Sequence, residues 1–245
     1  MWRFPPHFVF FTMDYLVYHP KREISEIGNL KIYHDSFSDN QDPYLWNDQF
    51  LHSFCHITQL RVEPKNILFW VSGDTYPNFT KLLCDCVFVV DSKKYWENAN
   101  QIQPTDLIVD NQQSFDHHYK WVNPPFNQHL FKRRRRYTLK ADCEKSFQPQ
   151  TENGDLIDLI PFFEQQGIST DVLINSIARN KSGKKSMNSR PYKLTQEQSQ
   201  KLYDYLTENS EIKIKGKDIK FKHPNRKEKE NYAHNNGYSK CGVKC

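Results

Sequence analysis

Glycine is scarce in this sequence, and its scarcity argues against one large group of binding sites. The chain has 8 Gly among its 245 residues, and no Walker loop, dinucleotide fingerprint or nucleophile elbow is present. These motifs need glycine because the backbone must approach a phosphate closely or adopt a positive φ angle. A nucleotide cofactor held by a glycine-rich loop is therefore not expected.

Long hydrophobic runs and closely spaced cysteines are missing as well. No apolar run approaches the roughly 20 residues that span a bilayer. Pro5, Pro6, His7 and Asp14 interrupt the hydrophobic start, unlike the sequence of a secretory signal. Six cysteines are too sparse for the disulfide framework of a small secreted protein. We therefore expect reduced thiols, a cytoplasmic location and no membrane association.

Aromatic residues are plentiful, and they mark an N-terminal part rich in strands. The chain has 17 Phe, 13 Tyr and 5 Trp, which bury much area per residue. Apolar spacing predicts a helix over Asp42–Cys55. Short β-branched or aromatic runs between turn-forming residues predict strands at Phe8–Val17, Leu30–Tyr33, Ile57–Val62, Ile67–Ser72, Leu82–Val90 and Leu107–Val109.

The C-terminal part has helical periodicity instead. Helices are predicted over Asp155–Gln166 and Thr170–Arg179, and a third begins at Thr195 with Gln198 as its capping-box partner. The following segment, 212–222, alternates apolar and basic residues and predicts a β-hairpin. Helices followed by a lysine-faced hairpin suggest a winged-helix-like region. We expect an α+β fold: a mixed, aromatic-rich β-sheet domain followed by a basic helical region with a β-hairpin.

Charge divides the chain into two parts of opposite sign. Residues 1–130 contain 10 Lys and Arg against 15 Asp and Glu, whereas residues 131–245 contain 24 against 14. Such asymmetry is typical of chains that contact nucleic acids or membranes. It predicts an acidic β-rich domain at 1–130 that would house any active site, a basic connector at 131–154, the helical and hairpin region at 155–222 and a polar basic tail at 223–245.

Clustered basic side chains in the second half predict a nucleic-acid interface. Each phosphate that a Lys or Arg neutralises releases condensed cations, so several on one surface bind strongly and in a salt-dependent way. Two alternatives are a solvated surface and a non-enzymatic adaptor whose basic half docks an acidic protein. The residues that we expect to contact nucleic acid are Lys132, Arg133, Arg134, Arg135, Arg136, Lys184, Lys185, Arg190, Lys213, Lys215, Lys220 and Lys222.

A catalytic grouping is predicted near the strand over 82–90. Asp74 is separated by 16 residues from Asp91-Ser92-Lys93. This spacing resembles the Asp…(Asp/Glu)-x-Lys pattern of restriction-endonuclease-like nucleases. The resemblance implies that two carboxylates hold Mg²⁺ and that Lys93 positions or activates the attacking water. Asp85 is an alternative first carboxylate, which makes Asp74, Asp85 and Asp91 the candidate metal ligands.

The cysteine and histidine groupings give weaker predictions of a functional site than the carboxylate grouping. Cys84-x-Cys86 and Cys241-x₃-Cys245 lack the usual two-residue spacing of zinc ligands, and zinc is not expected. Cys84 and Cys86 are expected to share one face of a strand. Asp116-His117-His118 places imidazole beside carboxylate, as acid–base or metal chemistry requires, but a scattered set of exposed or hydrogen-bonded histidines is the favoured interpretation.

Nucleic-acid binding is thus the leading function predicted. A nuclease or base-modifying activity on DNA or RNA would reside in the first domain. The expected biological setting is that of microbial mobile elements or defence. A Mg²⁺-dependent nuclease that uses Asp74, Asp91 and Lys93 is the first alternative. The adaptor is the second.

Overall fold

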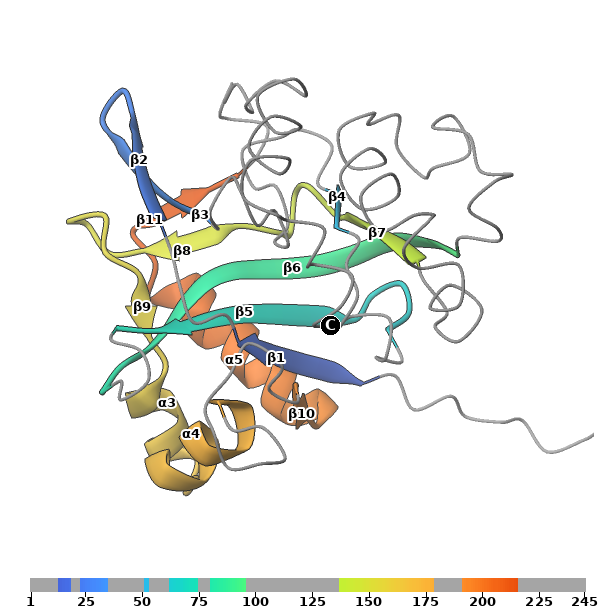
Figure 1. The fold of residues 1–245 in the computed structure, drawn as a ribbon, viewed down its shortest axis with the longest axis vertical. Helices are drawn as coiled ribbons and strands as arrows, with labels where there is room; N and C mark the ends of the chain where they lie inside the picture. Colours follow the sequence, from blue (N-terminus) through green and yellow to red (C-terminus); the bar gives the residue numbers. More distant parts are fainter. Residues whose placement is uncertain are drawn as a thin grey trace, which may run out of the picture.

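The computed structural model describes residues 13–18, 23–34, 51–52, 62–74, 80–95, 137–178 and 191–215. Within these residues a mixed β-sheet and a few helices form the architecture drawn in Figure 1. This confirms the α+β class expected from the sequence.

The central seven-stranded sheet combines strands from both parts of the chain. Its order is β10-β1-β5-β6-β7-β4, and β9 also pairs with β6. Only the β1–β5 pair among these is parallel. Strands β7, β9 and β10 follow residue 130 in the sequence, so the sheet continues across the boundary expected there. The bounds are β1 Asp14–Tyr18, β4 Leu51–His52, β5 Ile67–Gly73, β6 Leu82–Tyr95, β7 Tyr137–Ala141, β9 Ile157–Asp158 and β10 Tyr192–Leu194.

Two smaller sheets lie next to each other at one end of β6. Strand β2 (Glu23–Ile27) pairs with β3 (Leu30–His34), and β8 (Gln148–Gln150) pairs with β11 (Ile212–Ile214). Figure 1 shows the β2–β3 hairpin projecting beside β8 and β11. The second arm of the hairpin expected at 212–222 lies outside the described residues.

The middle strands of the central sheet, β1, β5 and the first part of β6, are buried on both faces, which explains why they read as nearly continuous apolar runs. Successive residues of β5 enter opposite cores: Leu68 and Trp70 pack on one side, and Phe69 and Val71 on the other. The second core also contains buried side chains from the three helices, namely Phe162, Phe163, Leu173, Ile177, Leu202 and Leu206. The helices therefore cover one face of the sheet.

Local signals define two of the three helices in the described residues well. Helix α5 (Gln196–Glu208) begins after Thr195, which forms the predicted capping box with Gln198. The Thr195 amide donates to the Gln198 side-chain oxygen at 3.0 Å, and the Gln198 amide donates to the Thr195 hydroxyl at 3.2 Å. Helix α4 spans Thr170–Ala178, close to its expected bounds.

Tertiary pairing changes two other expectations. Helix α3 covers only Ile160–Gln165, because Ile157–Asp158 at the start of the predicted helix pairs with β6 instead. The helix predicted over 42–55 is wrong at Leu51–His52, which form β4 and pair with β7. In both places pairing with a neighbouring strand outweighs helical periodicity. The strand expected at 107–109 and residues 57–61 of another lie outside the described part of the chain.

Candidate functional site

The carboxylates that were expected to share a metal ion lie at opposite ends of two paired strands. Asp74 follows the end of β5, where Gly73 pairs with Leu82. Asp91 lies nine residues beyond Leu82 on β6, past the other end of β5. At about 3.3 Å per residue, this separates Asp74 from Asp91 by on the order of 30 Å. The two side chains therefore do not share a metal ion in this fold.

Asp74 and Lys93 each have a structural role where they stand. Asp74 closes the β5–β6 connection by accepting hydrogen bonds from the amides of Thr80 and Lys81 at 2.7 and 3.0 Å. The Lys93 side chain is 4% exposed and forms an ion pair with Glu63 at 3.0 Å. Among the described residues, no three His, Cys, Asp or Glu side chains are grouped to hold a metal ion.

Asp85 occupies an irregularity in β6 that also separates the two cysteines. Trp70 pairs with Cys86 and Val71 with Cys84, so the register passes over Asp85. As a result Cys86 belongs to one core and Cys84 to the other. The expectation that these thiols share one face is therefore wrong, because a bulge reverses the alternation of side chains.

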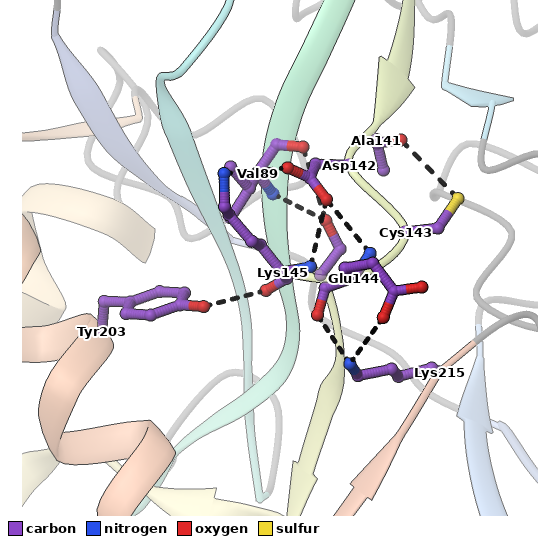
Figure 2. A network of polar contacts seen from close by, with 9 residues as sticks. Val89, Ala141, Asp142, Cys143, Glu144, Lys145, Tyr203 and Lys215 are labelled. Atoms are coloured by element: carbon purple, nitrogen blue, oxygen red, sulfur yellow. Dashed lines mark hydrogen bonds and ion pairs between the residues drawn. The ribbon is translucent and has the colours of Figure 1, made fainter.

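Two of the twelve basic residues predicted to contact nucleic acid lie in the described part of the chain. Lys213 is exposed between Ile212 and the buried Ile214, as the alternating pattern predicted. The Lys215 ammonium donates to the Glu144 carbonyl oxygen at 2.6 Å and lies 3.5 Å from the Glu144 carboxylate. Figure 2 shows this ammonium directed at the turn between β7 and β8.

The turn between β7 and β8, which Lys215 contacts, connects several elements of the fold. Asp142 accepts hydrogen bonds from the amides of Glu144 and Lys145 at 3.1 and 3.2 Å, and its carboxylate lies 3.1 Å from the Lys145 ammonium. The Tyr203 hydroxyl of α5 donates to the Lys145 carbonyl at 3.3 Å (Figure 2). Lys215 therefore serves here to tie β11 to this turn.

Charge is distributed unevenly between the described residues and three other segments of the chain. The described residues contain 11 Lys, no Arg and 18 Asp and Glu. We call them the acidic body. Three segments outside it, 131–136, 179–190 and 216–245, contain 18 Lys and Arg against 3 Asp and Glu. The remaining ten residues of the predicted interface all belong to these three segments, which we call the basic segments.

A groove of about 400 Å³ lies between the β2–β3 hairpin and the turn that links β8 to β9. Hydrogen bonds hold its two walls together. The Tyr33 hydroxyl donates to the Gly154 carbonyl at 3.2 Å, and the Lys31 ammonium lies 3.0 Å from Asp155. Burial raises the pKa of Tyr33, and the hydrogen bond to Asp155 raises the pKa of Lys31. Both groups therefore stay protonated and donate over the physiological pH range.

Two buried glutamines attach the hairpin to β8. The Tyr33 amide donates to the Gln148 side-chain oxygen at 2.9 Å, and the Gln148 side-chain nitrogen donates to the Tyr33 and Asp85 carbonyls at 2.8 Å each. The Gln150 side-chain nitrogen donates to the Lys31 carbonyl at 2.6 Å. The amide side chains thus replace a backbone ladder between β3 and β8.

The groove was not predicted from the sequence. Asn153-Gly154 is a strong turn dipeptide, and Gly154 has a φ of 74°, so the turn itself could have been found. Its proximity to the β2–β3 hairpin depends on contacts between residues more than 100 positions apart, such as the bond from Tyr33 to Gly154. Periodicity carries no signal for such contacts.

Comparison with known proteins found no match to this chain among family models, curated proteins or solved structures. No helix in the described part of the chain is both long and apolar enough to cross a membrane.

Proposed function

We propose that this chain binds nucleic acid through its basic segments. One observation carries the proposal: the acidic body contains more acids than lysines, whereas the three basic segments contain 18 Lys and Arg against 3 acids. A phosphate backbone is repelled by a surface of net negative charge. Binding through counterion release must therefore use the basic segments.

The lysines of the acidic body support this division. Five of them are engaged in ion pairs with Asp or Glu at 2.7–3.5 Å. A lysine paired with a nearby carboxylate neutralises a phosphate less effectively, because the carboxylate repels that phosphate. Arginine, which holds phosphate through two parallel hydrogen bonds, is absent from the acidic body, and all 10 Arg of the chain lie outside it.

The test compares two variants that lose the same amount of charge. In the first, Arg133, Arg134, Arg135 and Arg136 are each replaced by Gln. In the matched control, four exposed lysines of the acidic body are replaced by Gln: Lys65, Lys81, Lys193 and Lys201. Retention of labelled single-stranded and duplex DNA and RNA on a filter is measured at low salt. We expect the arginine variant to bind at least about tenfold more weakly, in line with the strong dependence of affinity on the number of phosphate contacts.

The control variant should bind as tightly as the unmodified chain. Equal weakening in both variants would mean that only the total charge matters and that the basic segments have no special role. Failure of the unmodified chain to retain any of the four nucleic acids would remove the proposal and favour the adaptor with an acidic protein partner.

A further inference from the structure

We propose that Asn153-Gly154, in the turn that links β8 to β9, is a deamidation site whose reaction is held back by the docked β2–β3 hairpin. Asn153 is exposed and lies directly before a glycine. A glycine amide is the least hindered backbone nucleophile, because glycine has no side chain. The site contains no residue of the basic segments, and the inference does not depend on nucleic-acid binding.

The reaction needs only these two residues and water. The Gly154 amide loses its proton to water, and its nitrogen attacks the side-chain carbonyl carbon of Asn153. A nitrogen–carbon bond forms, the bond from that carbon to the side-chain nitrogen breaks, and ammonia leaves after taking up a proton. Water then opens the succinimide ring at one of its two carbonyl carbons. The products are aspartate or isoaspartate at position 153, and no atom is oxidised or reduced.

The folded turn engages the nucleophile. The Gly154 amide donates to the Thr151 carbonyl at 2.9 Å, and the Thr151 amide donates to the Asp155 carbonyl at 2.8 Å. Gly154 is buried, although Asn153 beside it is exposed. The Gly154 nitrogen has to leave its bond to Thr151 before water can remove its proton. The reaction therefore proceeds from a locally opened turn, and the population of that opened form sets its rate.

The hairpin keeps this turn closed. The Tyr33 hydroxyl donates to the Gly154 carbonyl at 3.2 Å, and the Lys31 ammonium lies 3.0 Å from the Asp155 carboxylate. Both side chains belong to β3, so β3 contacts the turn at Gly154 itself and at the residue that follows it. Opening of the turn has to break these contacts, which lowers the population of the reactive form.

The products should loosen the hairpin in return. Isoaspartate adds a methylene group to the main chain, so the turn from Thr151 to Gly154 no longer has the length that its hydrogen bond requires. Either product also places a new carboxylate between the exposed acids Glu152 and Asp155, and like charges repel. Deamidation is therefore a one-way change that weakens docking of the hairpin.

The test follows the conversion of Asn153 at neutral pH by peptide mapping and mass spectrometry. Three samples are compared: the unmodified full chain, the full chain with Tyr33→Phe, and a synthetic peptide of residues 149–157, which lacks every contact with β3. The unmodified chain should react at least about tenfold more slowly than the peptide, as expected when two hydrogen bonds at Gly154 must break. Tyr33→Phe should react about fivefold faster than the unmodified chain, the factor that corresponds to one hydrogen bond of ordinary strength.

The chain contains its own reference site for this comparison. Asn236-Gly237 is a second Asn-Gly pair, and its rate should be the same in the unmodified chain and in Tyr33→Phe. The variant Asn153→Gln keeps a side-chain amide but should form no product at position 153. Equal rates at Asn153 with and without the Tyr33 hydroxyl, or a rate in the folded chain equal to that of the peptide, would overturn the proposal.

A second readout tests the effect on the hairpin. The isoaspartate form is isolated by ion exchange from a chain with Asn236→Gln, so that the reference site adds no charge. Hydrogen exchange of the Tyr33 amide should be faster in this form than in the unreacted chain. Asn153→Asp, which adds the charge without the methylene group, should accelerate exchange less. Unchanged exchange of Tyr33 in the isoaspartate form would contradict the coupling between the turn and the hairpin.

Discussion

Asp142 makes the turn between β7 and β8 sensitive to acid. Partial burial by itself would raise the pKa of Asp142, but the Lys145 ammonium and the amides of Lys145 and Glu144 outweigh burial, so the pKa lies below its usual 3.8. A carboxylate whose pKa is lowered by folding stabilises the protein above its unfolded-state pKa. That stabilisation is lost as the pH falls through the folded-state pKa.

Replacing Asp142 by Ala should therefore lower the free energy of unfolding by about 1 kcal/mol near neutral pH, as for other carboxylates that accept backbone amides. The difference from the unmodified chain should shrink as the pH falls below 3.8. Urea unfolding followed at neutral pH and in this acidic range measures it. Asp142→Asn, which keeps an acceptor oxygen but no charge, should cost less at neutral pH, and its difference from the unmodified chain should shrink over the same pH range, because the group that titrates is the Asp142 carboxylate of the unmodified chain. A difference for Asp142→Ala that stays constant over the range would contradict the ion-pair account.

Single residues also show where sequence reasoning reaches its limit. Lys213 and Lys215 were given the same role from the alternating pattern, yet Lys213 is exposed while Lys215 contacts Glu144. The alternation correctly places both lysines away from Ile214, which is buried. It carries no information on which acid lies nearby, since Glu144 is 71 positions earlier in the chain.

At the scale of elements, attachment of the β2–β3 hairpin depends on Gln148. Replacing this side chain by Leu would leave the amide and carbonyl of Tyr33 and the carbonyl of Asp85 without the bonds that they form now. The loss should reach at least about 2 kcal/mol, because each orphaned buried group costs on the order of 1–3 kcal/mol.

Thermal unfolding and hydrogen exchange of the Tyr33 amide measure the effect of Gln148→Leu. Exchange at Tyr33 should accelerate more than exchange in the paired centre of β5, since the hairpin detaches before the sheet opens. The control is Gln165→Leu at an exposed position of α3, which should change neither quantity. Unchanged protection of Tyr33 in the Gln148 variant would show that the hairpin is held by other contacts.

Elements whose signals are local could be predicted, and those that depend on distant pairing could not. The capping box of Thr195 and Gln198 lies within four residues and was predicted correctly. The strands at β3, β5 and β6 were also found; in β5 and the first part of β6, burial on both faces leaves a nearly continuous apolar run. Leu51–His52 and Ile157–Asp158 become strands only through β7 and β6. The bulge at Asp85 has no recognisable signal in the sequence. The sequence therefore did not predict that Cys84 and Cys86 belong to opposite cores.

At the scale of the whole molecule, the division of charge does not follow the two halves of the chain. The sheet takes strands from both sides of residue 130, and the acidic body includes many residues from the second half. The surplus of positive charge resides in three segments inserted between, or following, elements of the fold.

The salt dependence of nucleic-acid binding tests the central claim most directly. The dissociation constant for one duplex is measured over a range of NaCl concentrations, for the unmodified chain and for the variant with Gln at Arg133, Arg134, Arg135 and Arg136. Each phosphate contact contributes about 0.9 to the slope of log K against log salt concentration. We predict a steep negative slope for the unmodified chain and a slope shallower by about 2–4 for the variant. Equal slopes in the two proteins, or affinity that does not change with salt, would contradict binding through the basic segments.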